Sequence, residues 1–308
     1  MSDLKIFPAI GIARVGDALS EYYICPEVEG ALPSNPDGSE FTEHDFRDNE
    51  GRLKRQAARF KIFNGTEVVT VGSKVDGKKV VEIRWTVHLA NKKSSWYEFE
   101  TNKGEDGYAS NHALRNAGIK DDTQRRTQLI IDAGPRSISG CSRKGEEYHF
   151  SRQSIPGGYA GNFPPTDLKP SSINTLGELQ TDVHGNLLVL GGLGHSGSSV
   201  FPPSIDTYAN NDNWWDDTSD GPVEAEVILK GGSSVSVDNA WVLVGPPSYA
   251  PQIANLVTLY DTIFDTCVRN MGARPDIYKD GFWQYGKDSY TPYWESDICP
   301  ILRRGQMY

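Results

Sequence analysis

Residues 181–223 read TDVHGNLLVLGGLGHSGSSVFPPSIDTYANNDNWWDDTSDGPV. The run from Asn186 to Leu190 is mostly apolar and ends in a glycine cluster, as expected for a buried strand that enters a tight bend. Pro202 and Pro203 follow within a few residues, so the segment cannot continue as a helix. The stretch therefore predicts a strand, a glycine-rich bend and then a polar, aromatic loop.

The segments around this stretch also favour β structure. Residues 83–89 alternate between apolar and polar side chains, which is the pattern of a strand with one buried face. Further short strands are expected at 127–133, 224–229 and 241–244, and Asp76-Gly77 predicts a hairpin turn. Regular helices between the strands are missing, so we expect a mainly β fold with an antiparallel, sandwich-like body.

One long helix is expected near the C-terminus, over residues 251–271. Its apolar residues recur at steps of three and four and form a single stripe. Residues 45–59 are charged and read as a solvated segment that could be helical. The pattern predicts two domains: a β-rich domain over 1–245, and a helix with an aromatic tail over 246–308.

Charge and composition argue against several classes of function. The chain has 308 residues, with 31 basic and 41 acidic side chains and a net charge of −10. It has no basic stretch that would mark a nucleic-acid or anionic-membrane partner, and no apolar run approaches the ~20 residues of a membrane span. Nothing after Met1 resembles a signal peptide, so a cytoplasmic location is the default and export by an unconventional route is the alternative. The four cysteines are scattered, which argues against a zinc site or a disulfide framework.

Two motifs in the glycine cluster suggest enzymes that the neighbouring residues do not support. Residues 192–197 match G-x-G-x-x-G, but a dinucleotide site needs a helix to start there, and the prolines prevent one. Residues 194–198 nearly match the G-x-S-x-G serine motif but end in serine and lack the following helix. Close backbone packing is the favoured interpretation of the glycines, and a polar tip at a strand end that of His195.

The loop that follows contains four aspartates, Asp212, Asp216, Asp217 and Asp220. Their spacing does not fit the helix-loop-helix calcium pattern, so we predict no metal site and keep an irregular calcium site as the alternative. Aspartates that accept hydrogen bonds within their own turns are favoured.

The loop also contains two adjacent tryptophans, Trp214 and Trp215. Neighbouring side chains in an extended segment point to opposite faces. We therefore expect the pair to belong mainly to the core, with one ring available to a ligand or a partner.

Taken in order, the motifs of this chain resemble one family. The segments that carry the resemblance are IGIARVG at 10–16, HLANKKSSWY at 88–97, IIDAGPRSISG at 130–140, GELQTDVHGNLLVLGGLGHSGS at 177–198, DNWWDDTSDGPVEAEV at 212–227 and NAWVLVGPPSYAPQI at 239–253. This series resembles the N-terminal portion of the L-lysine ε-oxidase and glycine oxidase family, whose cofactor is cysteine tryptophylquinone. The resemblance implies oxidative deamination of an amino acid or amine by O2, with release of ammonia and hydrogen peroxide, and a flavoprotein that matures the cofactor.

The resemblance also sets expectations for individual residues. Family chains are longer, and their crosslinked Cys and Trp lie in the C-terminal portion. We therefore expect this chain to lack the quinone, to be inactive alone, and to need a C-terminal half or second chain. No catalytic residue is assigned; Trp214, Trp215, Asp216 and His195 are candidates to line the pocket. Trp294 and Cys299 are a remote alternative as cofactor residues.

A non-catalytic binding or assembly module that keeps the oxidase scaffold is the alternative function. The aromatic tail over 276–308 favours this alternative, because its tyrosines and tryptophans need either a partner or a packed return onto the body.

Overall fold

The computed structural model describes residues 3–28, 31–100, 112–248, 250, 253, 255–287 and 289–305. Pro251, at the start of the expected long helix, lies outside these residues. Within the described parts of the chain, no helix is both long and apolar enough to cross a membrane.

The described parts of the chain contain many strands, and nearly all of them lie within the first 245 residues. They are β1 (Leu4–Phe7), β2 (Ile10–Arg14), β3 (Tyr22–Ile24), β4 (Arg55–Asn64), β5 (Glu67–Val69), β6 (Lys74–Val75), β7 (Lys78–Val87), β8 (Ala90–Asn91), β9 (Ile131–Asp132), β10 (Arg136–Ser139), β11 (His149–Ser151), β12 (Lys169–Pro170), β13 (Thr175–Thr181), β14 (Leu187–Gly191), β15 (Ser196–Ser198), β16 (Trp214–Asp216), β17 (Ser219–Leu229), β18 (Ser234–Ser236), β19 (Ala240–Gly245), β20 (Tyr278–Lys279) and β21 (Phe282–Trp283). The helices are α1 (Asp122–Leu129), α2 (Leu259–Asn270) and α3 (Cys299–Arg304), and a π-helical turn, η6 (Trp294–Ile298), precedes α3.

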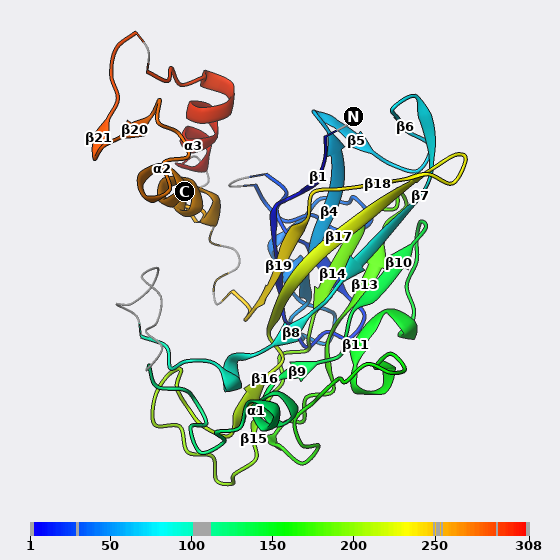
Figure 1. Cartoon of the computed structure of the whole chain (residues 1–308), viewed down its shortest axis with the longest axis vertical. Helices are drawn as coiled ribbons and strands as arrows, with labels where there is room; N and C mark the ends of the chain where they lie inside the picture. The colour runs from blue at the N-terminus through cyan, green and yellow to red at the C-terminus, as the bar shows by residue number, and fades with distance from the viewer. Residues whose placement is uncertain are drawn as a thin grey trace.

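Most of the strands form one large, curled sheet (Figure 1) with the order β10-β7-β17-β19-β2-β4-β14-β13-β11. Neighbours are antiparallel except for the parallel pairs β2–β19 and β3–β4. The curl brings β10, at one end of the order, against β13 near the other end. The mainly β, antiparallel fold is confirmed, with a single sheet that curls round its own core. Strands β12, β15 and β16 form a smaller sheet.

The core fills the inside of this curl. Its largest fully buried side chains include Phe60, Trp85 and Phe150. Trp85 comes from the predicted alternating segment, in which Ile83 and Val87 are also buried. The indole N–H of Trp85 donates to the carbonyl of Gly185 at 2.9 Å, so the ring is buried without an unpaired donor.

The local predictions for the hairpin and for the strand before the glycine cluster are confirmed. Asp76 and Gly77 have φ values of 48° and 77° and join β6 to β7, as the Asp-Gly turn predicts. Strand β14 is buried at every position and pairs with β13 and β4.

Three local predictions were wrong in type or extent. The strand expected at 127–133 is confined to β9, because its first three residues belong to α1. Asp121 caps this helix by accepting the Gln124 N–H at 2.9 Å. The segment 45–59 contains no α-helix, and its last residues begin β4.

The helix expected over 251–271 starts at Leu259. Thr258 and Asp261 form a reciprocal capping box that fixes this start. The elements after it, β20, β21, η6 and α3, occupy a tail for which no element was predicted. Figure 1 shows α2, β20, β21 and α3 as a separate group beside the sheet.

Gly221 provides a direct test of how closely the strands approach. A Cβ atom at this position of β17 would lie 1.7 Å from the carbonyl oxygen of His88, so an alanine forces the two backbones apart. We expect Gly221→Ala to lower the free energy of unfolding by about 1–3 kcal/mol, measured by urea denaturation. Gly118→Ala is the control, because a Cβ there meets nothing within 4 Å. Equal stability of the two variants would contradict this account.

Candidate functional site

The expected pocket segment lies at one end of the curled sheet, where it meets two of the other sequence motifs. Figure 1 shows β8, β9, β16 and α1 together at this end. Asn91 donates from its side chain to the carbonyl of Asp216 at 2.9 Å, and Ser94 donates to the carbonyl of Trp214 at 2.8 Å. The segments at 88–97 and 212–227, far apart in sequence, are therefore held together by side chains bonding to backbone.

The two tryptophans point to opposite faces of β16, as expected. Trp215 is 6% exposed, and its indole N–H donates to the carbonyl of Leu129 at the end of α1, at 3.0 Å. Trp214 is half-buried. Trp215 therefore belongs to the core, and Trp214 is the ring of the pair that remains accessible.

Asp216 is held by charge. The Lys93 ammonium lies 2.5 Å from its carboxylate and 2.7 Å from the Thr218 hydroxyl. The same carboxylate accepts from the Thr218 backbone N–H at 3.0 Å. Asp216 thus closes its own turn and fixes Lys93 beside the aromatic strand.

The glycine-rich bend packs onto the buried carboxylate of Asp217, which accepts the backbone N–H groups of Leu193 and His195 at 2.7 and 3.0 Å. A Cβ on Gly192 would lie 2.6 Å from the same carboxylate, so this position has no room for a side chain. The glycines thus serve close packing, and the segment continues into strand β15, without the helix that a dinucleotide site requires.

Burial raises the pKa of the Asp217 carboxyl to about 6, although its two backbone donors and nearby His195 act in the opposite direction. His195 is half-buried directly before β15, and its carbonyl accepts the Asp217 N–H at 3.0 Å. The contacts that fix His195 in the bend are thus made by its backbone.

The remaining aspartates of the loop also bond to nearby donors. Asp212 accepts the Asn116 N–H at 2.5 Å, and Asp220 accepts the Trp241 indole N–H at 3.0 Å. In the parts of the chain that the structure describes, no three His, Cys, Asp or Glu side chains are grouped to hold a metal ion. The prediction of aspartates that bond within their own turns is therefore correct for Asp216 only. Asp212, Asp217 and Asp220 accept from donors more than 20 residues away in the sequence.

A polar cluster at the same end, not predicted from the sequence, joins His88, Asp132 and Tyr159. Asp132 accepts from the Tyr159 hydroxyl and the Gly134 N–H at 2.8 and 2.9 Å, and lies 2.8 Å from the His88 ring. Burial alone would raise the pKa of Asp132, but these three partners outweigh it and lower the pKa. Gly134 has a φ of 80°, and a Cβ there would lie 2.8 Å from the Tyr159 ring.

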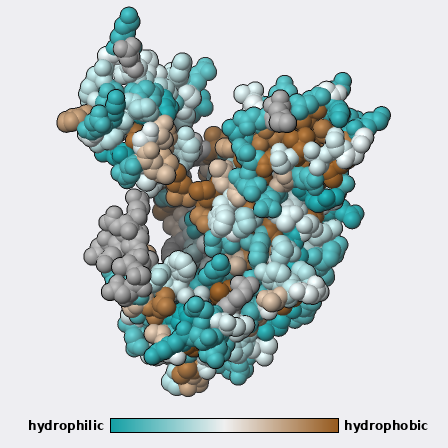
Figure 2. Space-filling view, in the orientation of Figure 1, coloured by the Kyte–Doolittle hydropathy of each residue, from teal (hydrophilic) through white to brown (hydrophobic). Residues whose placement is uncertain are grey.

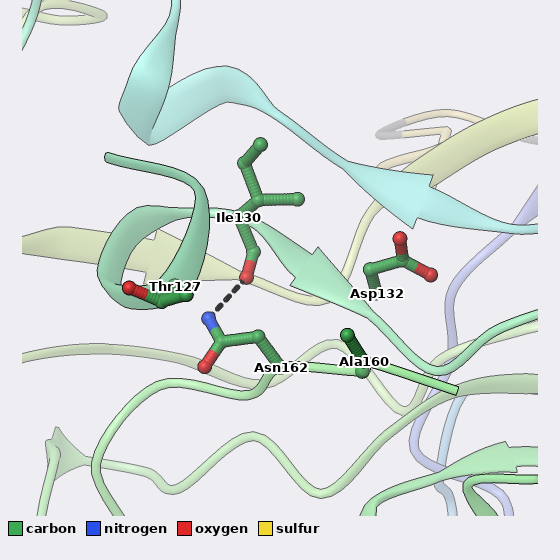
Figure 3. A pocket seen from close by; sticks show the side chains of 6 residues that line it. Thr127, Ile130, Asp132, Ala160 and Asn162 are labelled. Carbon is green, nitrogen blue, oxygen red and sulfur yellow. Dashed lines mark hydrogen bonds between the residues drawn. The ribbon is translucent and has the colours of Figure 1, made fainter. Parts of the chain in front are cut away.

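The signal for this cluster was present but indirect. His88 and Asp132 each lie in one of the motifs that carry the family resemblance, at or just after a strand end. Their meeting depends on the antiparallel pairing of β8 with β9, which periodicity does not reveal. A cavity of about 100 Å³ lies beside Asp132, lined also by Thr127, Ile130, Ala160, Gly161 and Asn162 (Figure 3).

Trp294 and Cys299 lie elsewhere, in the C-terminal group. Figure 1 shows α3 well away from β16. The Cys299 N–H donates to the Trp294 carbonyl across the π-helical turn, and Trp294 is 60% exposed. The structure therefore does not bring these two residues to the other candidates.

Comparisons with known proteins agree with the sequence motifs. Residues 7–244 match the family model described as L-Lysine epsilon oxidase N-terminal. The chain is 37% identical to L-lysine 6-oxidase from Marinomonas mediterranea, over 99% of this chain and 42% of that protein. The chain belongs to the L-lysine ε-oxidase N-terminal family.

Solved structures extend the family match to the whole described fold. A crystal structure of the Schiff base intermediate of L-Lys ε-oxidase from M. mediterranea with L-Lys matches with a TM-score of 0.80 and 36% identity, covering 98% of this chain and 44% of that one. A second structure of that enzyme matches at 0.79 and 37%. The chain thus spans less than half the length of the relatives it matches.

Stability should depend on pH through Asp217. Because its folded-state pKa lies above the ordinary 3.8, this carboxyl stabilises the fold fully below about pH 4 and loses that contribution as pH rises through 6. The difference is worth about 3 kcal/mol. We therefore expect the stability of the wild type relative to Asp217→Asn to fall by about that amount between pH 4 and pH 8, measured by urea unfolding.

Asp220→Asn removes the same charge from an exposed carboxylate and is the control. A wild-type advantage over Asp217→Asn that stays constant from pH 4 to pH 8 would contradict the assignment.

The Asp132 cluster should stabilise the fold through the Tyr159 hydroxyl. We expect Tyr159→Phe to cost about 1–3 kcal/mol, because a buried carboxylate oxygen loses its donor, and to cost less in an Asp132→Ala background. Tyr285→Phe, at an 88% exposed ring, should cost nothing measurable. Equal costs of Tyr159→Phe in both backgrounds would show that the hydroxyl does not act through Asp132.

Proposed function

We propose that this chain acts as the N-terminal part of a quinoprotein amino-acid oxidase. The parent reaction is oxidative deamination of an amino acid or amine by O2, with release of ammonia and hydrogen peroxide. The observation that carries the proposal is the match over 98% of this chain, at a TM-score of 0.80, to an enzyme solved as its Schiff base intermediate with L-Lys.

We place the cysteine tryptophylquinone outside these 308 residues. A reactive carbonyl that handles protons needs enclosed surroundings. Trp294, the tryptophan nearest in sequence to a cysteine, is 60% exposed, and Trp215 is fixed in the core by its bond to Leu129. Neither of these two tryptophans combines an enclosed site with access for a substrate within this chain alone, which supports a scaffold role and chemistry supplied by further polypeptide.

Within that scaffold, the half-buried Trp214 and the Lys93–Asp216 pair are our candidates to border the substrate pocket. They lie on the end of the sheet where three family motifs meet, and each is fixed by contacts to a second motif. His195 joins them through the bend. Their role is to shape and orient the pocket; no proton transfer is assigned to them.

The chain alone should contain no quinone. We expect its intact mass to equal that of the unmodified sequence, a quinone stain to be negative, and peroxide formation from lysine or glycine to stay at background. Co-expression with a maturation flavoprotein is the informative condition, because it removes missing maturation as an explanation. A crosslinked Cys–Trp with added oxygen, or amine-dependent peroxide, would overturn the proposal that the chemistry lies outside this chain.

A non-catalytic assembly module is the second candidate, and the exposure of the tail favours it. Tyr285 is 88% exposed, Tyr293 69% and Trp283 43%. Both candidates need a partner, so the discriminating measurement is peroxide production by the assembled complex. A complex that forms but never oxidises amines supports the assembly module.

A further inference from the structure

The C-terminal group, residues 255–305, has almost no core of its own. Val268 and Arg304 are its only buried side chains among the residues that the structure describes. Large apolar side chains on several of its elements are exposed, among them Leu259, Phe264, Phe282, Trp283, Ile301 and Leu302. An exposed apolar surface of this kind marks an interaction site more often than a solvated face.

Polar contacts hold the group together. The Arg304 guanidinium donates to the Leu256 carbonyl at 3.1 Å and pairs with Asp261 at 2.5 Å, which ties α3 to the start of α2. The Arg269 guanidinium lies 4.8 Å from the Trp283 ring, which ties α2 to β21. An exposed contact such as the Arg269–Trp283 pair contributes about 1 kcal/mol or less. The Arg304–Asp261 pair also carries the desolvation cost of a buried guanidinium, whereas ordering the backbone costs about 1–2 kcal/mol per residue. The group therefore needs apolar cover from outside.

The sheet does not supply this cover. Figure 2 shows the group beside the body of the protein with a gap between them and hydrophobic residues towards the gap. On the side of the body, the outward faces of β2 and β19 expose Ile10, Trp241 and Leu243. The body of the protein thus has exposed apolar side chains of its own on two neighbouring strands.

The comparisons indicate what covers them. The match to L-Lys ε-oxidase includes 98% of this chain, so the group is part of the shared fold although it cannot stabilise itself. More than half of the matched chain lies outside the aligned part. A conformation shared by these proteins but lacking a core is explained if that additional polypeptide packs on it.

We propose that the exposed apolar face of α2, β21 and α3 docks the polypeptide that corresponds to the remaining part of L-lysine 6-oxidase, whether it is joined to this chain or separate. The proposal rests on the proposed function, since it names the partner that the scaffold role requires. It commits to this occupant over a second copy of the chain.

A chimera tests it, in which this chain replaces the matched N-terminal 42% of the M. mediterranea enzyme. Hydrogen–deuterium exchange of the amides of α2 and α3 is compared between the chimera and the chain alone. We expect exchange to slow about tenfold or more in the chimera, since docking suppresses local opening.

Leu302→Asp is the matching variant. Leu302 is 57% exposed, so the substitution should leave the unfolding temperature of the chain alone unchanged, but it should lower that of the chimera by several degrees. Val183→Asp, at a 71% exposed position of the β body, is the control and should change neither. Where the chimera is insoluble, the two parts are co-expressed as separate chains and tested for co-purification.

Several outcomes would overturn the proposal. These are equal exchange of α2 and α3 in both proteins, a soluble C-terminal part that does not co-purify, and self-association of the chain alone that Leu302→Asp abolishes. None of these readouts needs the quinone. A chimera with a protected face but no peroxide would count against the proposed function only, and one that makes peroxide with the face still exchanging would count against the docking only.

Discussion

The fold depends on β4, the strand along which both arms of the curled sheet are joined. It pairs with β14 and with β1, β2, β3 and β5. At its first residue, Arg55 is 5% exposed and its guanidinium lies 2.8 Å from Glu178 of β13. A buried charge is tolerated only when it is paired, and the period of a strand is two residues. A shift of the β4 register by one residue would therefore expose the apolar face of the strand and leave the buried Arg55 guanidinium without its carboxylate partner.

With the sheet fixed in this way, the loops at one end can be polar and still be ordered. Asp132 and Asp217 are buried there, yet their environments shift their pKa values in opposite directions. Asp132 has a histidine, a phenol and a backbone N–H around it, and its pKa is lowered. Asp217 accepts from two backbone N–H groups, which do not offset its burial, and its pKa rises to about 6. The pKa values of two buried carboxyl groups at the same end of the sheet thus differ because their desolvation and their hydrogen-bond partners differ.

The sequence was informative where the physical cause is local. Alternation placed Ile83, Trp85 and Val87 correctly, and Asp-Gly placed the turn at residue 76, because pleating and positive φ act over a few residues. The same dipeptide at Asp280-Gly281 forms the turn of the β20–β21 hairpin, but the tail around it has no periodicity that would predict the flanking strands. The strand expected at 127–133 is shortened to β9, because the polar helix that starts at the Asp121 cap continues through Leu129. The His88–Asp132 contact depends on strand pairing, which single-sequence patterns do not encode.

The apolar stripe of α2 shows the limit of such reasoning most clearly. Periodicity identifies a helix face that must be buried, but it does not identify what buries it. In this chain the face of α2 remains exposed at Leu259, Tyr260 and Phe264 while its cap and its contacts to α3 are complete. Local sequence thus specifies the helix itself, but it does not specify which residues pack against the apolar face of the helix. A helix that is capped and ordered but whose apolar face is exposed has the properties of one half of an interface. The sequence of such a segment predicts that a helix forms, but it does not predict which residues pack against it.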